Sequence, residues 1–139
     1  MSGPASIAPD VEPASASHRA LWLPGLAFAA GGAVAATVVA AVADAADVSL
    51  EIAGERIPLL AFTQLAFAFS VVGIALAAAF RRWSGRPART FVRTTAALVV
   101  VSLVPDLLVP DVDAVTRVTL IVNHIAVAAI VIPGLRSRL

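Results

Sequence analysis

The chain has 139 residues, of which 60% are hydrophobic and only 14% are charged, and its formal net charge is +1. A soluble domain is usually about 45–50% apolar, and a chain this short has too little interior to hide the excess from water. The absence of cysteine excludes a disulfide framework, a thiolate metal site and a cysteine nucleophile. The composition therefore indicates a protein whose solvent is the lipid bilayer.

The first 19 residues are rich in Pro, Ala and Ser and show no apolar period, so we expect a disordered cytoplasmic tail. The apolar run at 20–43 then meets the roughly 20 residues that a helix needs to cross a membrane. A cleaved signal peptide is the alternative, because Ala41-Val42-Ala43 resembles a cleavage site. The run exceeds the usual length of about 7–15 residues, which favours an uncleaved anchor. Small residues follow one helical stripe of this run and favour close helix packing: Gly25, Ala29, Gly32, Ala36 and Ala43.

The next two segments define the orientation of the chain. Residues 44–57 are acidic and alternate in polarity around the turn residues Ala53-Gly54, which predicts a small β-hairpin in an outer loop. A second apolar run covers 58–80 and opens with Pro58. Residues 81–93 carry five arginines and no acid, and short loops of this kind stay in the cytoplasm. We interpret this arginine segment as a topology determinant rather than a lipid-headgroup or nucleic-acid site.

Two further spans are predicted at 90–108 and 115–135, separated by an acidic loop and followed by a basic C-terminus. Most of the ten basic residues fall on the predicted inner side: Arg19, Arg81, Arg82, Arg86, Arg89, Arg93, Arg136 and Arg138. The fold class is therefore all-α. We predict one four-helix transmembrane bundle over residues 20–139, with both termini cytoplasmic and the hairpin on the extracytoplasmic side.

The fourth span is the most informative for function, because Thr116, Thr119 and Asn123 share one side and aliphatic residues cover the other. Polar residues at membrane depth normally face the bundle interior. Counting about 1.5 Å per residue brings polar groups of three spans to similar depth and predicts an outward-opening polar cavity. Its expected lining is Gln64, Ser102, Asp106, Arg117, Asn123 and His124.

This cavity has a catalytic and a structural interpretation. His124 could act as an acid or base beside Asp106, and Arg117 could stabilise an anion or form an ion pair with Asp106 at the mouth. Groups of this kind are more often structural contacts between helices than a catalytic pair, and the sequence favours this structural interpretation. Two histidines in the whole chain make a poor ligand set, so no metal and no cofactor is expected.

Three classes of function remain open. The first is a structural or accessory membrane protein that associates with a second copy or another membrane protein, and the sequence leans toward this non-enzymatic reading. The alternative is a membrane-embedded enzyme or binder acting on a lipophilic small molecule. A small transporter ranks last, because the first span has no ionisable group before Asp44 at its outer end. The expected surroundings are the lipid bilayer, with no nucleic-acid partner.

One resemblance supports the fold. The segment Leu103-Val104-Pro105-Asp106-Leu107-Leu108, followed by Thr116-Arg117 and by Asn123-His124-Ile125-Ala126-Val127-Ala128-Ala129-Ile130-Val131-Ile132-Pro133, resembles the second half of a family of small, uncharacterised four-span bacterial membrane proteins. The first half matches in layout, so that the likeness extends over about residues 21–135. It implies a multi-pass protein of a bacterial plasma membrane, and it brings no catalytic residues.

Overall fold

The computed structural model describes residues 14–139, with their side chains from Ala20 onward. The elements in chain order are α1 (Ala14–Ala45), β1 (Glu51–Ile52), β2 (Glu55–Arg56), α2 (Leu59–Trp83), α3 (Pro87–Leu108) and α4 (Ala114–Arg136). Each of these helices is long and apolar enough to cross a membrane, which confirms the predicted bundle. The predicted disordered tail covers residues 1–19. Of these, 1–13 lie outside the described part, and α1 already begins at Ala14.

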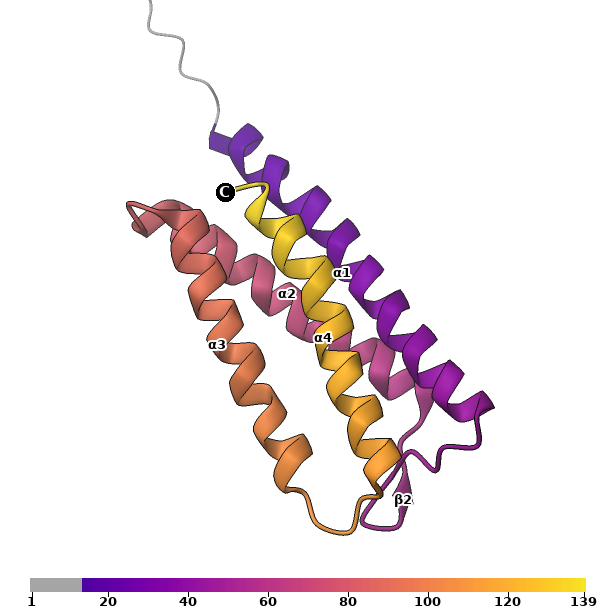
Figure 1. Cartoon of the computed structure of the whole chain (residues 1–139). Coiled ribbons are helices and arrows are strands. Elements are labelled where there is room, and N and C mark those ends of the chain that lie inside the picture. Colours follow the sequence, from indigo (N-terminus) through magenta and orange to yellow (C-terminus); the bar gives the residue numbers. More distant parts are fainter. Residues whose placement is uncertain (1–13) are drawn as a thin grey trace, which may run out of the picture.

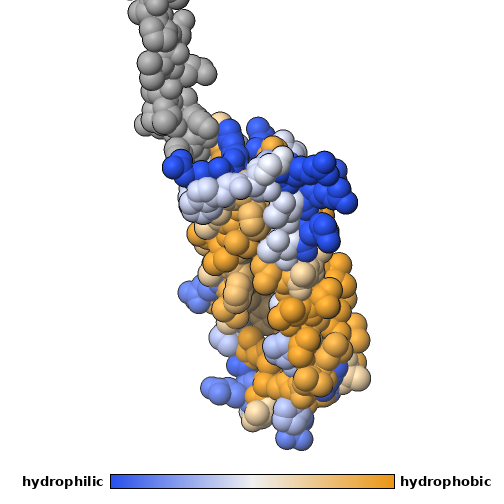
Figure 2. All heavy atoms as spheres, turned by 90° about the vertical axis from the view of Figure 1, so that its left-hand side faces the viewer, coloured by the Kyte–Doolittle hydropathy of each residue, from blue (hydrophilic) through white to orange (hydrophobic). Residues whose placement is uncertain are grey.

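The helices run back and forth between two ends of the molecule (Figure 1). The start of α1, the α2–α3 connection and the C-terminus lie at one end, and the hairpin and the α3–α4 connection lie at the other. Between the two ends the surface is a hydrophobic band, with hydrophilic side chains gathered above and below it (Figure 2). Large apolar side chains of the helices are strongly exposed, among them Leu23, Phe69 and Leu108 at about 70%, as expected for side chains that face lipid. The protein is therefore a multi-pass membrane protein.

Local sequence signals explain where the helices begin. Pro58 precedes α2 as an extended N-cap residue, and Pro87 is the first residue of α3, where its fixed φ suits the helix and its missing N–H costs nothing. This position of Pro87 explains why α3 begins three residues before the predicted start of the span. Asp113 is the N-cap of α4, and its carboxylate accepts hydrogen bonds from the backbone N–H groups of Val115 and Thr116.

The predicted hairpin is confirmed in the loop between α1 and α2. Its strands are antiparallel, with Glu51 opposite Arg56 and Ile52 opposite Glu55. Ala53 and Gly54 connect them, both with positive φ, which is the geometry of the tight turns that join twisted strands. The loop is fastened to the bundle by Leu50, whose side chain is fully buried among residues of α1, α2 and α4.

Helix α1 is the centre of the packing and makes its main contacts with α2 and α4. Its buried face consists of small side chains, which allow the neighbouring backbones to approach closely. These are Ala29, Ala33, Ala36, Ala40 and Ala43. The small-residue stripe predicted for this helix therefore packs within the chain.

Two apolar clusters lie one above the other in the bundle. The inner cluster, toward the C-terminal end, is centred on Ile74, Phe91 and Leu135. The outer cluster, toward the hairpin, is centred on Leu50, Phe62 and Leu120. Helix α3 contributes to the inner cluster through Phe91 but supplies no residue to the outer one. The outer half of α3 is therefore attached by other means, and these involve the predicted polar residues.

Candidate functional site

His124 of α4 and Asp106 of α3 meet in the outer half of the bundle. Nδ1 of His124 lies 3.0 Å from Oδ2 of Asp106, and the same nitrogen lies 3.1 Å from the carbonyl oxygen of Leu120 in its own helix. The Asp106 side chain is 14% exposed, and its Oδ2 has no well-directed hydrogen bond within the described chain. The ring nitrogen is thus shared between two oxygens. The structure brings together these two of the predicted site residues.

Arg117 lies beside this pair but makes different contacts from those expected. Its guanidinium group donates hydrogen bonds to the backbone carbonyls of Asp106, Leu107 and Val109, the first and the last of these at 3.0 Å. The predicted ion pair between Arg117 and the Asp106 carboxylate is therefore wrong. The physical reason is that the last carbonyls of a helix have no intrahelical partner, so the end of α3 offers several acceptors to one cation.

The side chains of Asn123 and Ser102 each donate a hydrogen bond to a backbone carbonyl oxygen. The Asn123 side chain is 6% exposed, and its Nδ2 donates to the carbonyl oxygen of Ala36 in α1 at 3.3 Å. The Ser102 hydroxyl donates to Val99 within α3 at 2.7 Å. Thr116 and Thr119 are buried on the same side of α4 as Asn123, which confirms the polar inner face predicted for this span. Asn123 joins two helices, whereas the Ser102 hydroxyl is used within its own.

Gln64 stands apart from the other predicted residues. It lies in the outer half of α2, its side chain is exposed, and it forms no hydrogen bond with any described residue. The buried residues of α2 are Phe62, Ser70, Ile74 and Ala77. At 100° per residue, Gln64 falls nearly opposite the side that these four share. Gln64 therefore points away from α1, with exposed Leu65 and Phe67 close by in sequence.

The sequence interpretation missed a polar network between the hairpin loop and the start of α4. Thr116 is fully buried, and its Oγ1 accepts a hydrogen bond from the backbone N–H of Leu50 at 3.2 Å. The same hydroxyl donates to the Asp113 carboxylate, which also accepts from Ser49 at 2.8 Å. The Thr116 hydroxyl, its backbone N–H and then Ser49 hold the pKa of Asp113 well below its usual range. The Asp113-to-Thr116 spacing is a helix-capping signal that could have revealed half of this network.

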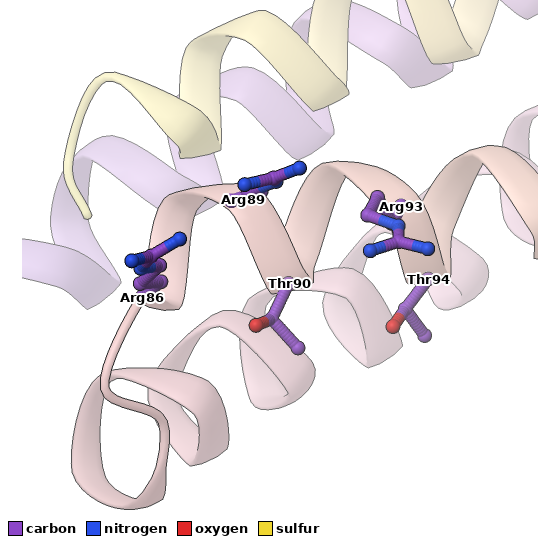
Figure 3. A pocket seen from close by; sticks show the side chains of 5 residues that line it. All are labelled: Arg86, Arg89, Thr90, Arg93 and Thr94. Carbon is purple, nitrogen blue, oxygen red and sulfur yellow. The ribbon is translucent and has the colours of Figure 1, made fainter.

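Neither of two hollows on the described surface is lined by the six predicted residues. One is an apolar depression of about 230 Å³ between the outer ends of α1 and α4. The other measures about 450 Å³ and lies at the opposite end of the molecule (Figure 3). Its lining comes from the first two turns of α3 and the residue before them: Arg86, Arg89, Thr90, Arg93 and Thr94. Among the described residues, no three His, Asp or Glu side chains are grouped so that they could hold a metal ion.

Comparison with known proteins identifies a family and adds no activity. Residues 16–139 match a family of unknown function, DUF6069. No curated protein and no solved structure shows a significant match to the chain. The expected likeness to a family of uncharacterised membrane proteins is thus confirmed, over a longer stretch than the motifs suggested. Because the match covers nearly the whole chain, the protein belongs to the DUF6069 family of unknown function.

Proposed function

We propose that the protein is an accessory component of a membrane assembly, and that it associates with a helix of another membrane chain through the outer half of α2. The observation that carries this proposal is the position of Gln64, an exposed amide about 9 Å from the outer end of its span. In hydrocarbon an unpaired polar group is costly, and hydrogen bonds between helices are the usual remedy.

Several polar side chains at the helix contacts of the spans already have partners, and this contrast supports the proposal. Thr37 and Thr63 share a hydrogen bond between α1 and α2, and Asn123 bonds to α1. Gln64 has both a donor and an acceptor free, and exposed Ala68 lies one turn further along the same face. A small residue beside an amide lets a partner helix approach closely enough to pair with it.

The absence of cysteine allows a direct test in native membranes. Ala68→Cys, treated with a short thiol-to-amine or thiol-to-thiol cross-linker, should give an adduct of one defined mass. A mass of twice the chain would identify a second copy, and any other single mass would identify a different partner. Adding Gln64→Leu should abolish the adduct. A monomer alone, or an adduct that survives Gln64→Leu, would contradict the proposal.

The control for this experiment is Phe69→Cys. Phe69 is 70% exposed and adjacent to Ala68 in sequence, but it points about 100° away around the helix. It should give no adduct of defined mass. Equal labelling at both positions would mean that the contact is random collision in the membrane.

A second candidate function is supported by the buried Oδ2 of Asp106, which has no well-directed hydrogen bond beside His124. This candidate is binding of, or chemistry on, a lipophilic small molecule in the outer half of the bundle. Native mass spectrometry of gently extracted protein would then show a bound compound that His124→Ala loses. Ser102→Ala should retain it, because the Ser102 hydroxyl bonds within its own helix.

A further inference from the structure

We propose that the basic hollow at the start of α3 binds the phosphate headgroup of an anionic phospholipid, and that the acyl chains of this lipid lie along the exposed face of the same helix. The proposal concerns the inner end of the molecule and is independent of the partner contact proposed for Gln64. It starts from the five residues that line the 450 Å³ hollow.

The lining residues form one stripe on α3. Arg86, Arg89 and Arg93 are spaced by three and four residues, and Thr90 and Thr94 by four, so that successive turns present them to the same side. Figure 3 shows the guanidinium groups following one another along the start of the helix, with Thr90 and Thr94 beside them on adjacent turns. The arginines are exposed and the threonines are half-buried, so the threonines form the floor of the hollow.

The hollow is held in shape by the loop before it. The hydroxyl groups of Ser84 and Thr90 are 2.9 Å apart and share a hydrogen bond. The backbone N–H of Arg86 donates to Ser84 Oγ at 3.2 Å, which holds Arg86 against the first turn of α3. The Thr94 hydroxyl has no partner within the described chain and is free to bind a ligand.

The charges in this hollow lack anionic partners among the described residues. Arg86, Arg89 and Arg93 take part in neither the Arg56–Asp44 nor the His124–Asp106 ion pair, both of which lie toward the other end of the molecule. A guanidinium group presents a planar fork of donors that matches two oxygens of a phosphate. Three such forks with a free hydroxyl therefore fit a phosphate ester better than a single carboxylate.

The surface beyond the hollow indicates that the phosphate belongs to a lipid. Continuing around the helix at 100° per residue, the same face of α3 carries exposed Val100, Val101, Val104 and Leu108, which are between 45% and 74% exposed. From Thr94 to Val104 the helix rises about 15 Å, which is half of the roughly 30 Å hydrocarbon core and hence the depth of one leaflet. A soluble phosphate compound has no acyl chains that could cover such an apolar strip.

The predicted orientation places the hollow in the cytoplasmic leaflet, where anionic lipids attract basic segments close to membrane spans. A zwitterionic lipid carries the same phosphate but adds a cation, which the three arginines would repel. The site should therefore distinguish phosphatidylglycerol from phosphatidylcholine.

The test is a lipid titration of the purified, delipidated full chain, followed by native mass spectrometry. Phosphatidylglycerol should bind more tightly than phosphatidylcholine, and Arg89→Gln combined with Arg93→Gln should weaken it about tenfold or more, given the usual attraction per arginine near an anionic lipid. The matched control is Arg136→Gln combined with Arg138→Gln, which removes the same charge from the same end but outside the hollow. This control should bind phosphatidylglycerol as the wild type does.

Three results would overturn the proposal. The first is an equal loss in both double variants, which would reveal general charge attraction. The second is equal affinity of the wild type for the two lipids, which needs no variant and is therefore immune to misfolding. The third is displacement of phosphatidylglycerol by millimolar inorganic phosphate, which would make the hollow a site for free phosphate. Arg89→Lys with Arg93→Lys keeps the charge and should lose only part of the affinity, because an ammonium group lacks the fork.

Discussion

Helix α3 is attached to the bundle differently from α1, α2 and α4. Helix α1 packs against α2 and α4 through small side chains along most of its length. A third of the apolar segments of α1 and α4 is buried, against 17% of that of α2 and 11% of that of α3. Helix α3 relies on Phe91 at its inner end and on Asp106 and the carbonyls bound by Arg117 at its outer end. In lipid, apolar surface gains little by leaving its surroundings, so close packing and polar contacts decide which helices associate.

The largest expected effect comes from the close packing of α1 against α4. A Cβ atom at Gly134 would lie 2.5 Å from the ring of Phe28, which is closer than real side chains approach. Gly134→Ala should therefore destabilise the protein by about 2–3 kcal/mol, as measured by unfolding of the purified protein in detergent. At Gly73 the nearest atom would be 3.6 Å away, and Gly73→Ala should be neutral or slightly stabilising. Equal effects at both glycines would show that the close approach of α1 to α4 at Gly134 contributes nothing measurable to stability.

The next effect concerns the hairpin loop, which caps the tightly packed helices. Thr116→Val keeps the shape of the side chain but leaves the buried N–H of Leu50 without an acceptor. The expected loss of unfolding free energy is about 1.5 kcal/mol. Thr119→Val is the control, since the Thr119 hydroxyl bonds only to Val115 in its own helix. If the two variants lose the same stability, the loop contact contributes nothing measurable.

A smaller effect on stability, but a visible one on geometry, is expected at the outer end of α3. Arg117→Met removes the hydrogen bonds to the α3 carbonyls and should cost about 1 kcal/mol or less, because the side chain is half-exposed. Spin labels at Leu107→Cys and Val115→Cys should report a broader distance distribution in this variant. Arg56→Met, which breaks an ion pair in the hairpin loop, should leave the distribution unchanged. An unchanged width in both variants would mean that α3 is held by other contacts.

The smallest effect is a pH dependence of the network at the start of α4. Because the pKa of Asp113 is lowered in the folded protein, its contribution is fully present above the unfolded value of about 4 and is lost as the pH falls through the lower folded value. Asp113 should therefore contribute nothing to any change in thermal stability between pH 7 and pH 5. The difference between wild type and Asp113→Asn should shrink only below about pH 4. A difference that shrinks between pH 7 and pH 5 would assign the network to another titrating group.

Much of the architecture could be predicted because its signals are local in the chain. Apolar runs of sufficient length marked the four spans, and Ala53-Gly54 marked the hairpin turn. A turn of 100° per residue places Thr116, Thr119 and Asn123 on one side of a helix, and this was enough to predict the buried side of α4. Each of these features depends on the hydropathy or the backbone preference of residues close together in sequence.

The candidate site was predictable only in part, because its contacts depend on how separate helices are rotated and spaced. Matching depths along the spans suggested that His124 and Asp106 could meet, and they do. The same argument placed Arg117 opposite the Asp106 carboxylate and Gln64 in the same group. In the structure, Arg117 instead donates hydrogen bonds to backbone carbonyls, and Gln64 is exposed. Depth is a property of one helix, whereas the direction in which a side chain meets its neighbour is not.

The sequence by itself determined that this chain crosses a membrane four times, and its arginines predict which end lies in the cytoplasm. These properties follow from the transfer of side chains between water and lipid, which each segment undergoes on its own. Only the tertiary structure decided that α3 is the loosely held helix, that Thr116 anchors the loop, and that the arginines before and within α3 surround a hollow. These properties arise from packing and hydrogen bonding between segments. Their geometry depends on how separate helices are placed, which no single stretch of sequence specifies.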